Sequence, residues 1–510
     1  MANVLIYAPF ANWCPHFETD LELAALALER GDNVTFFTCD GSLPTCEPNY
    51  EHSFLRCAMC KSRAAKGLEW LKSKQKKLTV STYNLNAREL STIKGIVNQP
   101  FNSIAEIKDL TYEGSDIGMA AISSAISQLR EPGLSLDSDL YLIRSHLETA
   151  LRVHHSLQII LQEAAFDEVI LFNGRFSALR PVLRAARLMK INVSVHERGP
   201  YINQYRISPN HYPHDPNACR ERLRSVMNVD KAIIQDVGNR WFEDRFNNIQ
   251  QGLKTFSQEH DKSLSVQIKH DAINVAIFVS SEDEHEAIPE WKNQHYMNQC
   301  DGIRRILQDA SQLNCHFLLR AHPNLVGIDN SQTRELAAIA NEFNNLTYIA
   351  PESKISTYEL IKQSDLVIVF GSTVGIEAAY LNKPVFVMGK AVYDVLECCI
   401  KPKSHEVLID MLDDYIATKK LPEIKNDAAV YGYLFSIPGI EFIYFRQTGF
   451  YEACLLDNGH CKKLGSSLKY LFFLFLFNNL KRTARLLRAF IPNELLKQYR
   501  KIQHPFKRTQ

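Results

Sequence analysis

The chain has 510 residues, with 58 Lys and Arg against 57 Asp and Glu, and 45% of its residues are hydrophobic. This balance is typical of a globular protein and excludes a collagen, a coiled coil or a disordered chain. At roughly 100 to 200 residues per domain, the length predicts a multi-domain enzyme of about two to four domains.

The charge is distributed unevenly along the chain. Residues 461–510 contain twelve Lys and Arg and a single acid, so residues 1–460 hold 46 basic and 56 acidic residues. Nucleic-acid binders more often spread basic charge over a folded domain, whereas a basic tail beside aromatic residues suits an anionic membrane surface. We therefore expect the tail to bind membrane and expect no nucleic-acid partner.

The N-terminus contains only a short apolar run, Val4–Tyr7, without a basic region before it, so no signal peptide is readable. The longest apolar run, Tyr470–Phe477, is shorter than the roughly 20 residues that a membrane-spanning helix needs. These features predict a cytoplasmic protein, peripheral at the inner face of the cell membrane. The twelve cysteines are expected to be thiols, or in part metal ligands, rather than a disulfide framework.

The first elements alternate between strand and helix, which predicts a parallel sheet covered by helices on both faces. They are a strand at Val4–Ala8, a helix at Phe17–Glu29, a strand at Asn33–Thr38, a strand at Val169–Phe172, a helix at about Pro181–Lys190 and a strand at Val193–Val195. Residues 46–155 lack this alternation and are expected to form a mainly helical insertion.

A second alternating series begins at Asn274, after a polar, helical connector over about 229–265. It comprises strands at Val275–Val279, His316–Leu319, Leu346–Ile349, Leu366–Val369 and Val385–Met388, with helices at about Met297–Leu313, Gln332–Asn341, Thr357–Gln363 and Gly375–Tyr380. We predict two doubly wound Rossmann-type domains facing a cleft, at residues 1–255 and 266–430, and a C-terminal extension at 431–510. Within this extension, Leu468–Phe490 is expected to form a basic amphipathic helix.

The segment 371–377, Gly-Ser-Thr-Val-Gly-Ile-Glu, follows an apolar strand and opens a helix. Its glycines allow close backbone approach, and amides and hydroxyls at such a point can hold a phosphate. A tight turn with an N-cap is an equally good interpretation of the loop alone. As donor-binding residues we select Gly371, Ser372, Thr373, Gly375 and Glu377, with Arg320 and His322 from the loop after the neighbouring strand.

Polar residues also follow three other predicted strands. Glu282 and Asp283 are candidate catalytic bases, although acidic runs are more often solvated loops. In the first domain, Glu197 or His196 could activate an acceptor hydroxyl. Asn173, Arg175 and Arg198 could bind the acceptor, or else form ion pairs between the domains.

Four residues of the insertion could hold a metal ion. Cys46, His52, Cys57 and Cys60 include one Cys-x-x-Cys pair, a weak signal for a structural zinc site. No other cofactor is expected, because no Asp-x-Asp stands at a strand end.

The segment from Ser364 to Tyr393, with Phe370 to Ala378, then Lys383-Pro384 and Gly389, resembles the capsule polysaccharide biosynthesis family, which includes bacterial β-Kdo transferases. Ser280–Glu284 and Arg320–Asn324 fit this resemblance. They are also similar to motifs of sialyltransferases and polysialyltransferases, although Glu284 stands where the latter usually have glycine, and of CDP-glycerol phosphotransferases. The resemblance implies a GT-B fold with the donor phosphate near His322, Ser372 and Thr373.

These observations together predict a metal-independent glycosyltransferase that builds a surface polysaccharide. The expected donor is a nucleotide-sugar, with a CMP-sugar such as a Kdo donor favoured, and the expected acceptor is a glycan or lipid-linked glycan. A CDP-glycerol-type phosphotransferase or a UDP-sugar epimerase on the same fold is one alternative. A non-catalytic subunit of a polysaccharide-synthesis complex is another.

Overall fold

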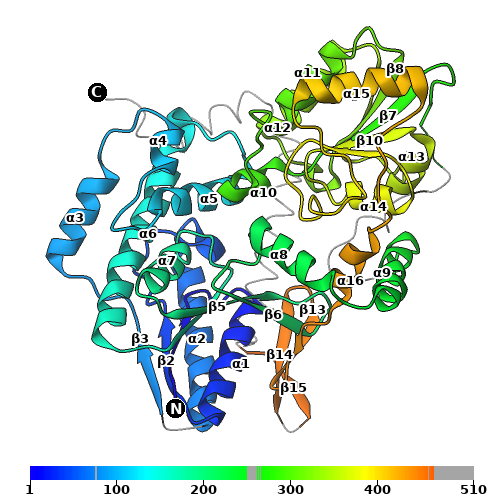
Figure 1. Cartoon of the computed structure of the whole chain (residues 1–510). Helices are drawn as coiled ribbons and strands as arrows, with labels where there is room; N and C mark the ends of the chain where they lie inside the picture. Colours follow the sequence, from blue (N-terminus) through cyan, green and yellow to red (C-terminus); the bar gives the residue numbers. More distant parts are fainter. Residues whose placement is uncertain (75–76, 250–260, 262–263, 265, 458, 465–510) are drawn as a thin grey trace, which may run out of the picture.

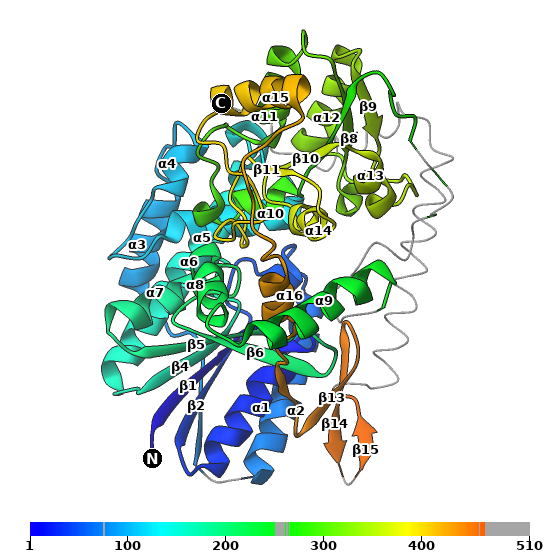
Figure 2. The same cartoon turned by 45° about the vertical axis from the view of Figure 1, so that its right-hand side comes forward.

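The computed structural model describes residues 1–464 except 75–76, 250–260, 262–263, 265 and 458. Two α/β units are stacked on each other, and the helices α8, α9 and α16 lie between them (Figures 1 and 2). Each unit is built around its own sheet, which is mainly parallel in the N-terminal unit and entirely parallel in the C-terminal unit. The predicted GT-B-like arrangement of two doubly wound domains is therefore confirmed.

The N-terminal sheet has seven strands in the order β12-β6-β5-β4-β1-β2-β3. Strands β5 to β3 run parallel, and β6 and β12 extend the edge in antiparallel fashion. The elements of this unit are β1 Asn3–Ala8, α1 His16–Glu29, β2 Asn33–Thr38, η1 Glu47–Asn49, α2 Phe54–Lys74, β3 Leu78–Ser81, α3 Ala87–Val97, α4 Ile104–Lys108, α5 Ile117–Leu129, α6 Leu136–Glu163, β4 Glu168–Phe172, α7 Arg180–Leu188, β5 Asn192–Arg198 and β6 Gln204–Pro209.

Alternate residues of the central strand β1 supply two separate hydrophobic cores. Leu5 and Tyr7 pack into the cluster under α6 and α7, whereas Val4 and Ile6 pack into the cluster under α1 and α2. Side chains on a strand point alternately to opposite faces, so a continuous apolar run is needed where helices cover both faces.

The insertion is mainly helical, but it also contains a strand that the sequence analysis missed. β3 pairs in parallel with β2 and forms the edge of the sheet. Strand β5 also runs three residues beyond the predicted Val195, because β6 pairs with it as far as Arg198. His196, Glu197 and Arg198 are therefore strand residues rather than loop residues.

The C-terminal sheet has five parallel strands in the order β11-β10-β7-β8-β9. Val275 and Ile277 of β7 point into one core, and Ala276 and Phe278 point into the other. The elements of this unit are β7 Ile273–Phe278, α10 Glu282–Glu286, η3 Pro289–Trp291, α11 Gln299–Asp309, β8 Cys315–Arg320, η4 Pro323–Leu325, α12 Ser331–Glu342, β9 Leu346–Ile349, α13 Thr357–Gln363, β10 Leu366–Val369, α14 Val374–Tyr380, β11 Val385–Val387 and α15 His405–Thr418.

The chain crosses between the two units twice. It crosses first through α8 (Pro216–Val226) and α9 (Lys231–Phe246), and it returns through α16 (Ala429–Ser436) to β12 (Ile440–Glu441). Helices α9 and α16 pack so closely that a Cβ added at Gly238 would lie 2.0 Å from the carbonyl oxygen of Ala429. Only glycine permits this approach of the two backbones.

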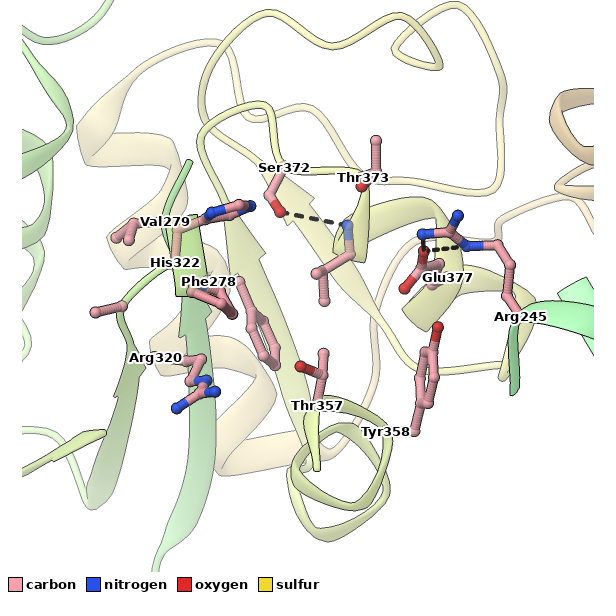
Figure 3. Close-up of a pocket in the computed structure, with 13 residues that line it drawn as sticks. Arg245, Phe278, Val279, Arg320, His322, Thr357, Tyr358, Ser372, Thr373 and Glu377 are labelled. Carbon is pink, nitrogen blue, oxygen red and sulfur yellow. Dashed lines mark hydrogen bonds and ion pairs between the residues drawn. The ribbon is translucent and has the colours of Figure 1, made fainter. Parts of the chain in front are cut away.

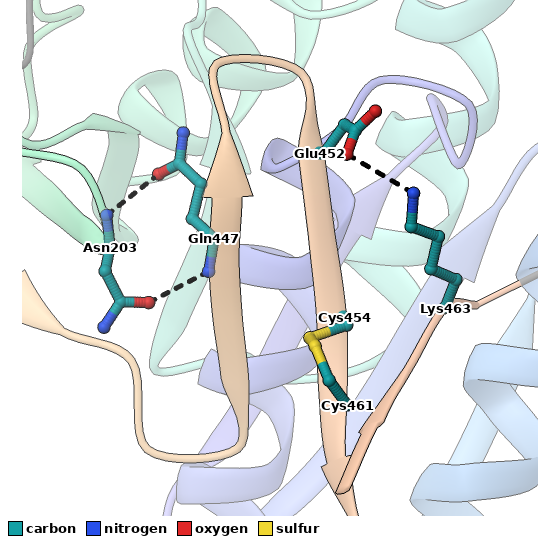
Figure 4. The surroundings of a disulfide bond; sticks show 6 residues. All are labelled: Asn203, Gln447, Glu452, Cys454, Cys461 and Lys463. Atoms are coloured by element: carbon teal, nitrogen blue, oxygen red, sulfur yellow. Dashed lines mark hydrogen bonds and ion pairs between the residues drawn. A yellow bond between two sulfur atoms is a disulfide. The ribbon is translucent and has the colours of Figure 1, made fainter.

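A three-stranded antiparallel sheet follows, with β13 at Phe445–Gly449, β14 at Glu452–Asp457 and β15 at His460–Lys462. It is joined to the N-terminal unit by Gln447, whose N–H donates to Asn203 Oδ1 at 2.9 Å (Figure 4). A disulfide links Cys454 to Cys461 across the hairpin. The expectation of free thiols was therefore wrong for this pair, because hairpin pairing brings two cysteines seven residues apart into contact.

Within the described residues, no helix is long and apolar enough to span a bilayer. The predicted basic helix at 468–490 lies outside the described residues.

Candidate functional site

A pocket opens at the carboxyl ends of β7, β8 and β10 in the C-terminal unit (Figure 3). Its walls contain five of the seven residues predicted to bind the donor, namely Arg320, His322, Ser372, Thr373 and Glu377. Strands in an open parallel sheet end on the same edge, which is why segments about 50 residues apart meet here.

Two glycines pack the 371–377 loop against the chain that follows β11. Gly371 has a φ of +133°, and a Cβ there would lie 2.6 Å from the carbonyl oxygen of Lys390. A Cβ at Gly375 would lie 2.3 Å from the hydroxyl oxygen of Tyr393. The two glycines thus shape the loop, and Ser372 and Thr373 line the pocket.

His322 stands on the opposite wall of the pocket from Glu377 (Figure 3). Its Nδ1 accepts a hydrogen bond of 3.0 Å from the backbone N–H of Asn324, which caps η4. Burial, together with nearby Arg320, lowers the pKa of His322 to about 4. The neutral imidazole therefore carries its proton on Nε2, in the form that donates a hydrogen bond to an anion without adding charge.

The guanidinium of Arg320, at the wall of the pocket, is hydrogen-bonded to the backbone. It donates to the carbonyl oxygens of Ala350 at 2.8 Å and Ser353 at 2.9 Å. It holds the loop after β9 against the end of β8. Its Nε–H has no hydrogen-bond partner among the described residues, so a donor of Arg320 remains for the predicted contact with a phosphate.

Glu377 forms an ion pair with Arg245 of α9, with 2.7 Å between Nη2 and the carboxylate oxygen. Arg245, together with Tyr358 and Thr357 of α13, completes the wall, as Figure 3 shows. Sequence analysis missed all three. Arg245 lies in the connector, 132 residues from its partner, and no local pattern links the two.

The two predicted acidic bases lie outside this pocket. Glu282 is buried on the far side of α10, where its Oε1 accepts from the backbone N–H of Gln299 at 2.8 Å. Burial raises the pKa of Glu282 to about 8, with Glu286 and Glu335 adding to the shift. Glu282 belongs to a second pocket, between α10, α11 and α12, that also contains these two carboxyl groups.

Asp283 is paired with a cation from the insertion. The guanidinium of Arg130, which follows α5, donates to Asp283, and its Nη2 donates to Ser281 Oγ at 3.1 Å. An ion-paired carboxylate is a poorer proton acceptor than a free one. The structure therefore does not bring Glu282 or Asp283 into a position suited to a catalytic base.

Glu197 stands at the end of β5 among polar partners. Asn173 Nδ2 donates to it at 3.0 Å, and the Nε2 atoms of His16 and His214 lie 3.6 and 3.7 Å from its oxygens. Burial alone would raise the pKa of Glu197, but these groups hold it well below its usual value. Glu197 is thus a stably ionised carboxylate.

The other predicted first-domain residues differ in their surroundings. His196 is buried, and its Nε2 lies 2.7 Å from Asp20 of α1, so it serves the packing of α1 on the sheet. Arg175 donates to Ser127 Oγ at 3.0 Å, and it is close enough to Asp283 to interact with it electrostatically across the domain boundary.

Arg198 stacks on the ring of Phe450, with 3.7 Å between its guanidinium carbon and the ring centroid. Phe450 lies in the turn between β13 and β14, so the three-stranded antiparallel sheet covers this predicted acceptor residue.

The proposed zinc ligands are not assembled into a site. Within the described residues, no group of three or more His, Cys, Asp or Glu side chains is placed to hold a metal ion. Cys46, His52, Cys57 and Cys60 thus provide no ligand set in this structure.

Residues 292–398 match the family model described as capsule polysaccharide biosynthesis protein. This match begins just after η3 and ends at Cys398, beyond β11, and it confirms, for this segment, the resemblance seen in the sequence. The comparison with curated proteins found no match.

Several solved structures are similar to the chain at low identity. The β-Kdo 2,7 transferase KpsC of Thermosulfurimonas dismutans is 13% identical, over 64% of this chain and 89% of that one, with a TM-score of 0.34. The UDP-GlcNAc 2-epimerase of Neisseria meningitidis is 12% identical, over 86% and 98% of the two chains, with a TM-score of 0.25. CalG4, the calicheamicin glycosyltransferase, is 11% identical, over 86% and 94%, with a TM-score of 0.25.

Proposed function

We propose that the chain is a glycosyltransferase of capsule or other surface polysaccharide synthesis, with a nucleotide-sugar donor in the C-terminal unit and a glycan or lipid-linked glycan acceptor on the N-terminal unit. The observation that carries this proposal is the convergence of His322, Ser372 and Thr373 on one pocket at the carboxyl edge of a parallel sheet. Two hydroxyls and a neutral imidazole are donors suited to phosphate oxygens.

The remaining walls suit a nucleoside. Phe278 and Tyr358 offer aromatic surface, and the carboxyl oxygens of Glu377 beside Arg245 offer acceptors for ribose hydroxyls. A CMP-sugar is the donor we favour, in keeping with the family that the sequence resembles. Hydrogen-bond donors at the leaving phosphate would stabilise the developing charge, so the proposal does not require a metal ion.

The test is calorimetric titration of CMP, CDP, UDP and GDP into the wild-type chain and into His322→Ala and Ser372→Ala. Losing one hydrogen bond to a charged phosphate costs about 1.5–3 kcal/mol, or roughly 10- to 150-fold in affinity. His270→Ala is the matched control, because this exposed histidine lies before β7, at the opposite edge of the sheet.

Binding of a cytidine nucleotide that both variants weaken and the control preserves would support the proposal. Selective binding of UDP would instead favour a UDP-sugar transferase or epimerase. Failure of every nucleotide to bind to folded protein would contradict the donor site and favour a non-catalytic subunit.

We further propose that the basic C-terminal tail holds this enzyme at the cytoplasmic face of an anionic membrane. Twelve basic residues against one acid in 461–510 support this proposal. Co-sedimentation with phosphatidylserine-containing vesicles should be lost on truncation after Leu464, and phosphatidylcholine vesicles serve as the control. Equal sedimentation of the full and truncated chains would contradict it.

A further inference from the structure

His214 lies in the loop between β6 and α8, at the boundary of the two units. Its carbonyl oxygen accepts a 2.9 Å hydrogen bond from the indole N–H of Trp291, which belongs to the C-terminal unit. Both views show α8, which begins two residues later, between the N-terminal sheet and α10 (Figures 1 and 2). The loop is therefore fixed at the boundary between the N-terminal and C-terminal units.

The side chain of His214 is half exposed, with 50% of its surface accessible, whereas that of Glu197 is 19% accessible. His214 Nε2 lies 3.7 Å from Glu197 Oε2. A carboxylate facing one ring nitrogen fixes the proton on that nitrogen, which leaves the lone pair on the other. Within the described chain, Nδ1 of His214 has no hydrogen-bond partner, so it is the nitrogen able to accept a proton.

The other basic groups around Glu197 are less suited to this task. His16 is buried and stacks on Phe172, with 3.8 Å between ring centroids, and burial lowers its pKa to about 3. Glu197 itself is enclosed and held ionised by its neighbours. A carboxylate so stabilised orients a base better than it acts as one.

The charged groups facing His214 come from both units. Besides Glu197 of β5, Glu284 of α10 is close enough to interact with it, and Asp215 is its chain neighbour.

Resting on the glycosyltransferase function proposed above, we propose that His214 is the general base for the acceptor, oriented by Glu197 as a positioning residue. The acceptor hydroxyl oxygen forms the new bond to the anomeric carbon of the donor, and its proton passes to His214 Nδ1. The bond from the anomeric carbon to the phosphate oxygen breaks, and its electron pair leaves with the nucleotide.

The experiment measures release of CMP from CMP-N-acetylneuraminic acid and from CMP-Kdo formed in situ, with water or oligosaccharides as acceptor. His214→Ala should lower kcat by roughly 100- to 10,000-fold, and added imidazole should restore part of it. Glu197→Gln should lower kcat without changing KM for the donor. CMP affinity should be the same in all variants, because the nucleotide pocket lies in the other unit.

His211→Ala is the matched control, since His211 lies in the same loop and pairs with Asp215 at 3.5 Å. It should keep wild-type kcat. A His214→Ala variant with full activity, or one that loses activity without rescue by imidazole, would overturn the proposal. Wild-type protein that binds CMP but turns over neither donor would also overturn it, while leaving the nucleotide site intact.

Discussion

Glu282 provides a quantitative test of the electrostatics of the pocket between α10, α11 and α12. Its carboxyl group is buried, and its Oε1 accepts from the Gln299 amide. Burial raises its pKa to about 8, against an ordinary value near 4.5. Since a difference of one in pKa corresponds to about 1.36 kcal/mol, this rise sets an upper limit of about 5 kcal/mol on the cost of ionising Glu282.

The direction in which stability changes with pH follows from the number of protons bound in the folded and unfolded states. Between about pH 4.5 and pH 8 the folded chain keeps the Glu282 proton and the unfolded chain has lost it, so this group destabilises the fold progressively as pH rises. Glu282→Gln keeps an acceptor for the Gln299 amide and cannot ionise. The variant should therefore gain stability over wild type as pH rises through this window.

The assay is thermal unfolding of wild type and variants at pH 5, 6, 7 and 8.5. A gain of 5 kcal/mol corresponds to roughly 10–20 °C in Tm for a unit of this size, so several degrees should appear even if relaxation halves the effect. Glu335→Gln, which removes a partly exposed carboxylate from the same wall, is the matched control. A Tm difference between the two variants that is constant from pH 5 to pH 8.5 would refute the reasoning.

Three further substitutions test packing and charge elsewhere. Gly375→Ala should lower the Tm, because its Cβ would overlap the Tyr393 hydroxyl and overpacking costs about 1–3 kcal/mol; a wild-type Tm would contradict the packing. Arg245→Met should lower the free energy of unfolding by about 3–5 kcal/mol in a denaturant titration, because it leaves buried Glu377 without a cation. Arg245→Met with Glu377→Leu should recover most of this loss, and an unchanged free energy of unfolding in the single variant would contradict this pairing. Arg130→Ala should increase the radius of gyration in small-angle scattering while leaving CMP affinity unchanged, and identical scattering would show that its ion pair does not hold the units together.

Sequence patterns located the C-terminal sheet closely. The predicted strand Val275–Val279 corresponds to β7, and Leu366–Val369 matches β10 residue for residue. Buried parallel strands are continuous apolar runs between polar loops, so their signal is local. The same logic placed Ser372 and His322 on one sheet edge, where the structure brings them into one pocket.

The rest depended on contacts that local patterns do not encode. Strand β3 is short and half polar, and only its pairing with β2 makes it a strand. Arg130 and Asp283 are 153 residues apart in sequence. The acidic run at 282–284 gave no sign that α10 would turn Glu282 away from the pocket, because the direction of a side chain on a short helix follows from what packs against it.

The same contacts explain why chemistry at this site would depend on how the two units meet. The insertion reaches the C-terminal unit through Arg130 and through Glu131, whose carboxylate accepts from the Ser331 N–H at the start of α12. The loop of His214 reaches it through the Trp291 indole. The proposed donor pocket lies in the C-terminal unit, whereas His214 and Glu197 lie in the N-terminal unit and its connection. A shift between the units would separate His214 from the donor before it disturbed either sheet, so closure of the two units would limit transfer to the moment when donor and acceptor are both bound.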